Sequence, residues 1–205
     1  MTKESKHPRH RRGARATQLV LEAALEFAAR NGLDATTIEA LAGSLHVGKT
    51  TMYRRWPNAS ALMIDALLSE ITSLAPIQGR ASVRETFLAA MMSLVELYNG
   101  HRGELIRSLI GRAQGDASLI AQLSSRWVEP RRKIAREFIR EGVRRNELKK
   151  DTDPDIVLDC LYGAIYHRFL MPYDNAELNR AFVERVVRTV FDGAACSTST
   201  IHANG

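Results

Sequence analysis

The chain has 205 residues, of which 45% are hydrophobic and 25% are charged. This composition is typical of soluble globular proteins, and no uninterrupted apolar run approaches the ~18 residues that a membrane span needs. The N-terminus is basic, but the following stretch carries Glu22 and Glu26 and is therefore a poor signal peptide. We expect a cytoplasmic protein with one large domain or two small ones.

The positive charge is concentrated at the N-terminal end. Residues 1–56 hold ten Lys or Arg against five Asp or Glu, so that they carry +5 of the formal net charge of +6. This asymmetry predicts a polyanionic partner for the N-terminal part alone. Residues 1–13 are nearly devoid of apolar residues and are expected to form a disordered basic arm. This arm is either a solvated tail or a segment that contacts DNA, at the phosphates or in a minor groove. The candidate DNA-contacting residues of the arm are Arg9, Arg11 and Arg12.

Residues 14–30 are predicted to form the first helix, because apolar residues line one side and Asn31-Gly32 supplies a stop signal. A second helix follows, with apolar residues at the i, i+3, i+4 and i+7 positions Ile38, Leu41, Ala42 and Leu45. Thr36 and Glu39 have the spacing of a capping box at its start.

After a turn that contains Val47, a third helix is expected to run to Trp56, where Pro57 ends it. It buries little beyond Met52 and Trp56 and presents hydroxyl and cationic groups at Lys49, Thr50, Thr51, Tyr53, Arg54 and Arg55. A short helix with so many hydrogen-bond donors suits phosphates and base edges in a major groove. The alternative is a helical hairpin that happens to be basic; we favour a DNA-binding helix-turn-helix.

The remainder is predicted to be helical throughout, with helices at about 60–74, 82–98, 105–110, 118–145, 155–170 and 177–191 and a polar tail at 194–205. Ser60 is a candidate cap for the first of them, and Pro130 is expected to kink the long helix or divide it. Asn146 suits a left-handed helix end, while Asp153 and Pro154 form a typical helix start.

The last two helices are apolar on more than one face, which predicts a homodimer through a four-helix bundle. The expected interface residues are Ile156, Cys160, Gly163, Ala164, Phe182, Val186 and Val190. Simple burial within one subunit is the alternative, and on that view Cys160 is a small core residue.

Catalytic chemistry is not expected. The histidines and the two cysteines, Cys160 and Cys196, have no metal-ligand spacing, and no phosphate-binding glycine loop is present, so we predict no enzyme activity, metal or cofactor. A small-molecule pocket could be lined by Met91, Met92, Trp127, Phe138, Tyr162, Tyr166 and His167, although an ordinary core has the same composition.

The segment GLDATTIEALAGSLHVGKTTMYRRWPNASALMIDAL resembles the DNA-binding region of the tetracycline-repressor (TetR) family of bacterial transcriptional regulators. The residues at the family's positions are Gly32, Thr37, Leu41, Ala42, Val47, Thr51, Tyr53 and Trp56. The strong resemblance covers residues 14–65, and the rest matches only in helical layout. Two positions depart from the family: His46 stands where Gly is usual, and Ala59 stands where a phosphate-binding Lys is frequent.

The resemblance implies an all-α fold with a helix-turn-helix domain at 14–59 and a ligand-binding and dimerisation domain at 60–193. It implies a homodimeric repressor that a small molecule releases from a palindromic operator by moving the fourth helix. Thr37 and Tyr53 resemble phosphate contacts, Lys49, Thr50 and Thr51 resemble base contacts, Arg54 also faces DNA, and Arg55 points to the DNA backbone or to the first helix. The alternatives are a helical interaction protein without operator recognition, an activator, or a regulator that answers a protein partner.

Overall fold

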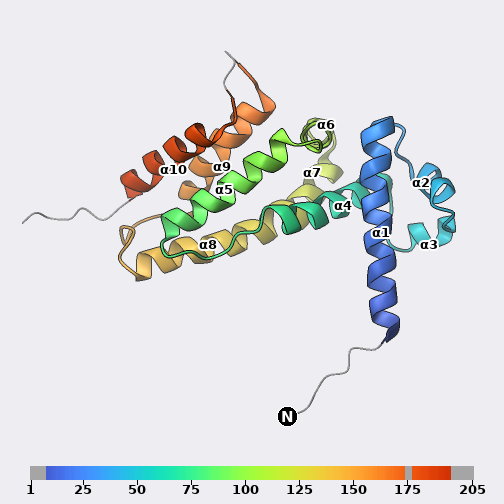
Figure 1. Cartoon of the computed structure of the whole chain (residues 1–205), viewed down its shortest axis with the longest axis horizontal. Helices are drawn as coiled ribbons and strands as arrows, with labels where there is room; N and C mark the ends of the chain where they lie inside the picture. The colour runs from blue at the N-terminus through green and yellow to red at the C-terminus, as the bar shows by residue number, and fades with distance from the viewer. Residues whose placement is uncertain (1–7, 174–176, 195–205) are drawn as a thin grey trace, which may run out of the picture. The chain divides into compact units, whose positions relative to one another are not determined.

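The computed structural model describes residues 8–173 and 177–194 (Figure 1). Their helices are α1 (Pro8–Asn31), α2 (Ile38–Ser44), α3 (Lys49–Tyr53), α4 (Ala59–Leu74), α5 (Val83–Asn99), α6 (Gly103–Ala113), α7 (Ala117–Leu123), the π-helix η1 (Ser124–Val128), α8 (Glu129–Arg144), α9 (Pro154–Leu170) and α10 (Arg180–Ala194). The fold is all-α, as predicted. Within this part of the chain, no helix combines the length and hydrophobicity needed to cross a membrane.

The chain divides into two compact units. Unit 1 contains the chain up to Leu74 together with Gly100–Val128, and unit 2 contains Ala75–Asn99 together with the chain from Glu129 onward. This division differs from the expected boundary near residue 59. The fourth helix groups with the N-terminal helices because α4 packs against α1, and α7 and η1 group with them because both pack against α4.

The first helix begins earlier than expected. We predicted a disordered arm over residues 1–13, but residues 8–13 already belong to α1, so the prediction is wrong for that stretch. The physical reason is Pro8, whose fixed backbone angle and missing N–H suit the first turn of a helix. Residues 1–7 and the tail after 194, which includes Cys196, lie outside the described residues, as do the side chains of Arg9, Arg11 and Arg12.

In unit 1, α4 is the central helix. Four consecutive residues, from Ala61 to Ile64, are almost completely buried, which requires packing on every side of the helix. On one side lies α1, which contributes Ala24, Leu25 and Ala28 to the core, and α7 and η1 also contact α4. The helix that follows the predicted DNA-binding segment is therefore part of the core of unit 1.

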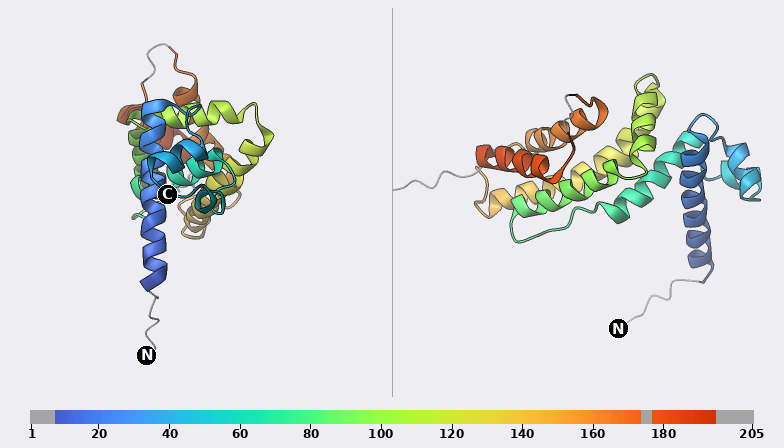
Figure 2. Two further views of the ribbon diagram at one scale, coloured as in Figure 1. Left: turned by 90° about the vertical axis from the view of Figure 1, so that its right-hand side faces the viewer. Right: turned by 45° about the horizontal axis from the view of Figure 1, so that its top comes forward.

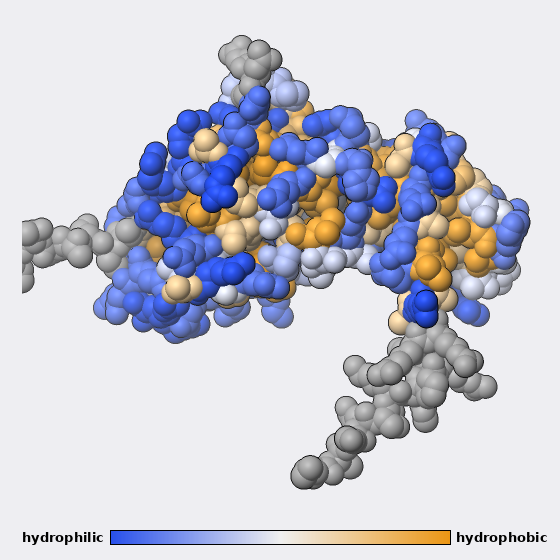
Figure 3. Space-filling model, in the orientation of Figure 1, coloured by the Kyte–Doolittle hydropathy of each residue, from blue (hydrophilic) through white to orange (hydrophobic). Residues whose placement is uncertain are grey.

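In unit 2, α5 contacts α8, α9 and α10 (Figure 2). Two aromatic residues of α5 contact aromatic residues of the neighbouring helices. The Phe87 ring contacts that of Phe191 in α10, with 5.9 Å between the ring centroids, and the Tyr98 ring stacks on that of Phe169 in α9, with 4.1 Å between the centroids. Figure 3 shows hydrophilic residues covering most of this face of unit 2, with hydrophobic residues visible between them. The core of unit 2 is mainly aliphatic, and the two aromatic pairs lie where α5 packs against α10 and α9.

The turns and caps agree only in part with the predictions. His46 and Asn146 take left-handed conformations, with φ of 52° and 57°, and Asp153 caps α9 by accepting a hydrogen bond from the Asp155 amide at 2.8 Å. The predicted cap of α2 was wrong by one residue: Thr37 accepts from the Ala40 amide. Thr36 is buried and donates to the carbonyl of Gly32 at 2.7 Å, because its position faces the core.

Two further boundaries need correction. Asn58 rather than Ser60 caps α4, since its side-chain oxygen accepts from the Ala61 amide at 2.8 Å. The recognition helix α3 ends at Tyr53 rather than at Trp56. Backbone hydrogen bonds of helical spacing nevertheless continue to the Trp56 amide, which donates to the carbonyl of Met52 at 2.9 Å, and the Trp56 side chain is 3% exposed.

The long helix predicted at 118–145 is interrupted. A π-helical turn over Ser124–Val128 separates α7 from α8, just before Pro130. A proline inside a helix lacks an N–H group and clashes with the carbonyl of residue i−4, here Arg126. A wider turn accommodates that clash, and π-turns are a recognised cause of irregularity inside long helices. Pro130 therefore divides the helix.

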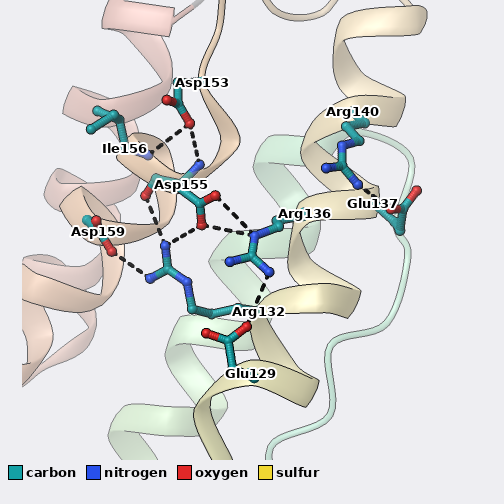
Figure 4. A network of polar contacts seen from close by, with 9 residues as sticks. All are labelled: Glu129, Arg132, Arg136, Glu137, Arg140, Asp153, Asp155, Ile156 and Asp159. Carbon is teal, nitrogen blue, oxygen red and sulfur yellow. Dashed lines mark hydrogen bonds and ion pairs between the residues drawn. The ribbon is translucent and has the colours of Figure 1, made fainter. Parts of the chain in front are cut away.

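A network of charges joins α8 to the start of α9 (Figure 4). Arg132 donates to Asp155 and Asp159, each at 2.5 Å, and Arg136 donates to Asp155 at 2.9 Å. Arg136 also pairs with Glu129 at 3.5 Å. The hydrogen bond from Arg132, together with that from Arg136, holds the pKa of the Asp155 carboxyl below its usual value, although burial acts in the opposite direction. Asp155 therefore ties two helices together in its ionised form.

Candidate DNA-binding interface

The helices α2 and α3 form a helix-turn-helix whose connection depends on His46 and Val47 (Figure 1). The left-handed backbone of His46 turns the chain, and the Val47 amide donates to the carbonyl of Ala42 at 3.0 Å. Met52 is the buried residue of α3, with 1% of its surface exposed. One anchor on a helix this short leaves the other side chains exposed, and these include the predicted contacts Lys49, Thr50, Thr51, Tyr53 and Arg54.

Thr37 stands at the start of α2 with its side chain exposed. Its hydroxyl oxygen accepts a hydrogen bond from the Ala40 amide at 3.1 Å. A hydroxyl group has one donor as well as two acceptor positions, so this cap leaves the Thr37 O–H able to donate. The arrangement places an additional donor at the N-terminus of the helix that precedes the recognition helix.

Glu39 links α2 to α3, a contact that the sequence analysis missed. The Tyr53 hydroxyl donates to the Glu39 carboxylate at 2.5 Å. This bond lowers the pKa of Glu39, with a further lowering from its own backbone amide and from the positive charge of Lys49, and it raises the pKa of Tyr53. The spacing of Glu39 and Tyr53 in the sequence does not predict this contact, because a turn separates the two residues. They meet because of the angle between α2 and α3.

Arg55 points toward α1. Its guanidinium donates to the hydroxyl of Thr17, which is the contact with the first helix that the sequence offered as one of two alternatives; the contact of Arg55 with the DNA backbone stays a prediction. The same group lies 5.9 Å from the centroid of the Trp56 ring. Arg55 therefore connects the end of the recognition segment to α1.

The end of the recognition helix is fastened to α4 by Asp65. The indole N–H of Trp56 donates to one Asp65 oxygen at 3.0 Å, and Arg126 of η1 donates to the other at 2.7 Å. One carboxylate thus connects three segments of unit 1. Sequence reasoning placed Trp56 in the core but did not identify Asp65 as its partner, because the bond depends on how α4 packs.

The expected pocket residues come from both units. Trp127 is buried and belongs to unit 1, whereas the other six belong to unit 2. Within unit 2, Tyr162 and Tyr166 of α9 lie near Tyr98, and burial is the main cause that raises the pKa values of all three. His167 is exposed and its ring contacts that of Tyr173 at 5.4 Å. The pocket assignment accordingly stays a prediction.

The expected dimer residues fall into two groups. On α9, Ile156 is 60% exposed, and Cys160 and Gly163 are also exposed on the same side of the helix. The interpretation of Cys160 as a core residue is therefore wrong, because its side of α9 faces away from α5 and α8. On α10, Phe182 is buried beneath the guanidinium of Arg168, which lies 3.7 Å from its ring centroid. Val186 and Val190 are half-buried.

Unit 1 contains a cleft that the sequence did not predict. Its volume is about 310 Å³, and its walls come from α1, α4 and the start of α6. Arg102 and Glu70 form an ion pair at 3.1 Å in its wall, and Glu22 and Glu26 add negative charge. None of the seven expected pocket residues lines this cleft.

Comparison with known families gives a match over most of the chain. Residues 20–66 match the family described as "Bacterial regulatory proteins, tetR family". Residues 77–190 match that described as "Tetracyclin repressor-like, C-terminal domain". The first match covers the helix-turn-helix with parts of α1 and α4, and the second begins within unit 2 and covers more than half of the chain.

Individual relatives agree with these matches. The chain is 29% identical to the HTH-type transcriptional regulator YdeS of Bacillus subtilis over 88% of this chain and 90% of that one. It is 26% identical to the DNA-binding transcriptional repressor TetR of Mycobacteroides abscessus, over 87% and 93% of the two chains. The crystal structure of the TetR family transcription regulator SCO0332 superposes with a TM-score of 0.75 at 30% identity, covering 86% and 97%. The chain belongs to the tetR family of bacterial regulatory proteins.

Proposed function

We propose that this DNA-binding transcriptional regulator is a homodimeric repressor that reads a palindromic operator and is released from it by a small molecule. The observation that carries the proposal is the exposed donor surface of α3, which a single buried residue, Met52, holds against the core. The name of the Mycobacteroides abscessus relative, a DNA-binding transcriptional repressor, supports repression rather than activation.

The side chains divide into two roles in this proposal. Lys49, Thr50 and Thr51 occupy the first turns of α3 and reach base edges, where hydrogen bonding distinguishes one sequence from another. Thr37 donates its free O–H to a phosphate, and Tyr53 and Arg54 contact the DNA backbone; such contacts set the register of the protein on DNA without reading sequence. Arg55 supports α3 through Thr17.

Dimerisation is proposed to use the exposed side of α9, at Ile156, Cys160 and Gly163, with Ala164, Val186 and Val190 at its edge. A glycine on an exposed helix face allows the backbone of a second helix to approach closely, and a Cβ added at Gly163 would meet nothing within 4 Å in the protomer. Two-fold symmetry then matches two half-sites about one helical turn apart on DNA.

The effector is proposed to bind unit 2, and the residues that we expect near it are Met91, Met92, Phe138, Tyr162, Tyr166 and His167. Communication with DNA would run through α4, whose last residue, Leu74, is followed in the chain by Ala75 of unit 2. The Asp65 carboxylate on that helix holds Trp56 at the end of the recognition segment. Because linkage is reciprocal, an effector that favours the non-binding state weakens DNA binding and is itself bound less tightly on DNA.

Selection of bound duplexes from a random-sequence pool, with the purified full-length protein at near-physiological salt, tests this function. The expected result is a palindrome with two half-sites. Enrichment of nothing, together with binding that simply collapses as salt rises, would remove operator recognition, because any basic protein binds DNA electrostatically.

Two variants separate the assigned roles on the selected operator. Lys49→Ala is expected to change the preferred base at one position of each half-site, whereas Thr37→Val is expected to weaken binding to operator and random DNA alike. Thr37→Ser retains both the cap and the donor and serves as the matched control. Equal losses on operator and random DNA for Lys49→Ala would contradict its role in reading bases.

A further inference from the structure

Glu39 is an unusual residue for a surface that faces DNA. It is the single acidic residue between Asp34 and Asp65, a stretch that contains Lys49, Arg54 and Arg55. Its side chain is exposed, and its carboxylate accepts the hydrogen bond of the Tyr53 hydroxyl across the helix-turn-helix. A negative group therefore stands beside one of the groups that we propose to contact phosphates.

The bond occupies the only proton that Tyr53 can donate. A phenol has one O–H, so a Tyr53 hydroxyl that donates to Glu39 cannot at the same time donate to a phosphate oxygen. The carboxylate is also ionised at neutral pH, since the Tyr53 hydrogen bond and the Lys49 charge lower the pKa of Glu39. A phosphate that approaches Tyr53 meets a like charge and has to replace Glu39 as the acceptor.

We propose that Glu39 is a specificity-determining residue, which keeps Tyr53 from contacting phosphates until the operator contacts of α3 have formed. The inference rests on the proposed function, because it requires Lys49, Thr50 and Thr51 to read bases. On random DNA these contacts are missing, Tyr53 stays bonded to Glu39, and the carboxylate repels the backbone. On the operator α3 lies deeper in the groove, and a phosphate displaces Glu39.

Repulsion of this kind affects random DNA more than the operator. Non-specific binding is almost entirely electrostatic, so an additional like charge removes a large part of it. Specific binding has other contacts that compensate for the exchange at Tyr53. Discrimination between partners commonly uses such a repulsive element in addition to attractive ones.

The test measures the affinity of Glu39→Gln for the selected operator and for a random-sequence duplex of equal length. We expect the variant to bind the random duplex roughly fivefold to tenfold more tightly, about the net effect of one hydrogen bond, and the operator with less than about a twofold change. Equal tightening on both duplexes would overturn a role in specificity. Weaker binding to the operator would show that Glu39 reads a base or supports Tyr53, and would also overturn the proposal.

A double-mutant cycle tests whether the Tyr53 hydroxyl is involved. Tyr53→Phe is expected to change random-duplex affinity little in the wild-type background, where the hydroxyl is bonded to Glu39. In the Glu39→Gln background it is expected to remove part of the gain, because a neutral amide oxygen holds the hydroxyl less strongly than a carboxylate and a phosphate then replaces it. A gain that persists in full in the double variant would assign the effect to charge alone and would overturn the exchange at Tyr53.

Three controls complete the experiment. Glu26→Gln removes the same charge from α1 in the wall of the cleft, and no change in the affinity ratio is expected. Glu39→Asp keeps a negative charge near the start of α2 but withdraws it from the hydroxyl, and it should reproduce part of the gain of Glu39→Gln. Thermal unfolding by circular dichroism checks that each variant is folded. If selection recovers no palindrome, the proposed function fails, whereas the random-duplex cycle still decides whether Glu39 withholds Tyr53 from phosphates.

Discussion

At the scale of single residues, the structure assigns several polar groups to partners that their sequence position does not suggest. Tyr53 is bonded to Glu39, Arg55 to Thr17 and Trp56 to Asp65. In each pair the two members come from different segments of unit 1. These bonds set the orientation of the recognition helix, and they explain why a five-residue helix can hold a defined surface.

Tyr98 provides a prediction at this scale. Among the described residues its buried hydroxyl makes no hydrogen bond of normal geometry, although it interacts with Tyr166, and its ring stacks on Phe169. Tyr98→Phe keeps the stacking and removes the buried polar group, so the free energy of unfolding should stay constant or rise by up to about 1 kcal/mol. Denaturant unfolding measures the change. A loss of stability larger than about 1 kcal/mol would mean that the hydroxyl is engaged in the native protein.

The same residue predicts behaviour at high pH. Burial raises the pKa of Tyr98 well above 10, so the neutral phenol is favoured in the folded state. Its contribution to stability is complete below the pKa of an unfolded tyrosine, about 10, and is lost as the pH rises toward the raised folded value. Absorbance at the phenolate band should therefore show fewer ionised tyrosines at about pH 11 in native protein than in urea-unfolded protein. Identical titration curves would contradict this.

At the scale of elements, the stability of α9 depends on charges at its first turn. Asp155 accepts from Arg132 and Arg136 of α8, and Asp153 caps the helix. We expect Asp155→Asn to unfold at a lower temperature than wild type at pH 7. Asp192→Asn, which removes an exposed carboxylate paired with Arg84, is the matched control and should have a smaller effect.

The effect of Asp155→Asn should depend on pH in a defined direction. The folded pKa of Asp155 is lowered, so its contribution exists above the unfolded pKa of about 3.9 and disappears as the pH falls through the lower folded value. The difference in midpoint between wild type and variant should shrink below about pH 4. A midpoint difference between wild type and Asp155→Asn that is the same at pH 7 and below about pH 4 would show that the variant loses stability through packing rather than through charge.

At the scale of the whole molecule, the proposed dimer provides the third set of predictions. Gly163 lies on the exposed side of α9, and a Cβ there meets nothing within 4 Å. Gly163→Glu should therefore leave the protomer folded but prevent a second helix from approaching. Sedimentation velocity is expected to show a monomer, and affinity for the palindrome should fall at least about tenfold, because the two half-sites are no longer bound together.

Gly111 offers a control for this experiment. It is an exposed glycine of α6 in unit 1, and a Cβ added there also meets nothing within 4 Å. Gly111→Glu makes the same chemical change on another helix and should leave the assembly unchanged. A Gly163→Glu protein that sediments as a dimer would exclude this side of α9 from the interface.

The sequence alone predicted the helical fold and the helix-turn-helix, because both depend on local signals. Apolar spacing located the helices, His46 and Asn146 marked left-handed turns, and Asp153 with Pro154 marked the start of α9. Each of these signals involves only a few neighbouring residues, so it can be recognised from the sequence without the tertiary structure. The family resemblance rested on the same segment.

Only the tertiary structure decided which groups meet. The cap at Thr37 and the exposure of Cys160 depended on which side of each helix the neighbouring helices cover. The Glu39–Tyr53 bond depended on the angle between α2 and α3, and Asp65 reaches Trp56 because α4 packs in the core of unit 1. Sequence spacing fixes the face of a helix on which a side chain lies, whereas partners on different helices are determined by packing.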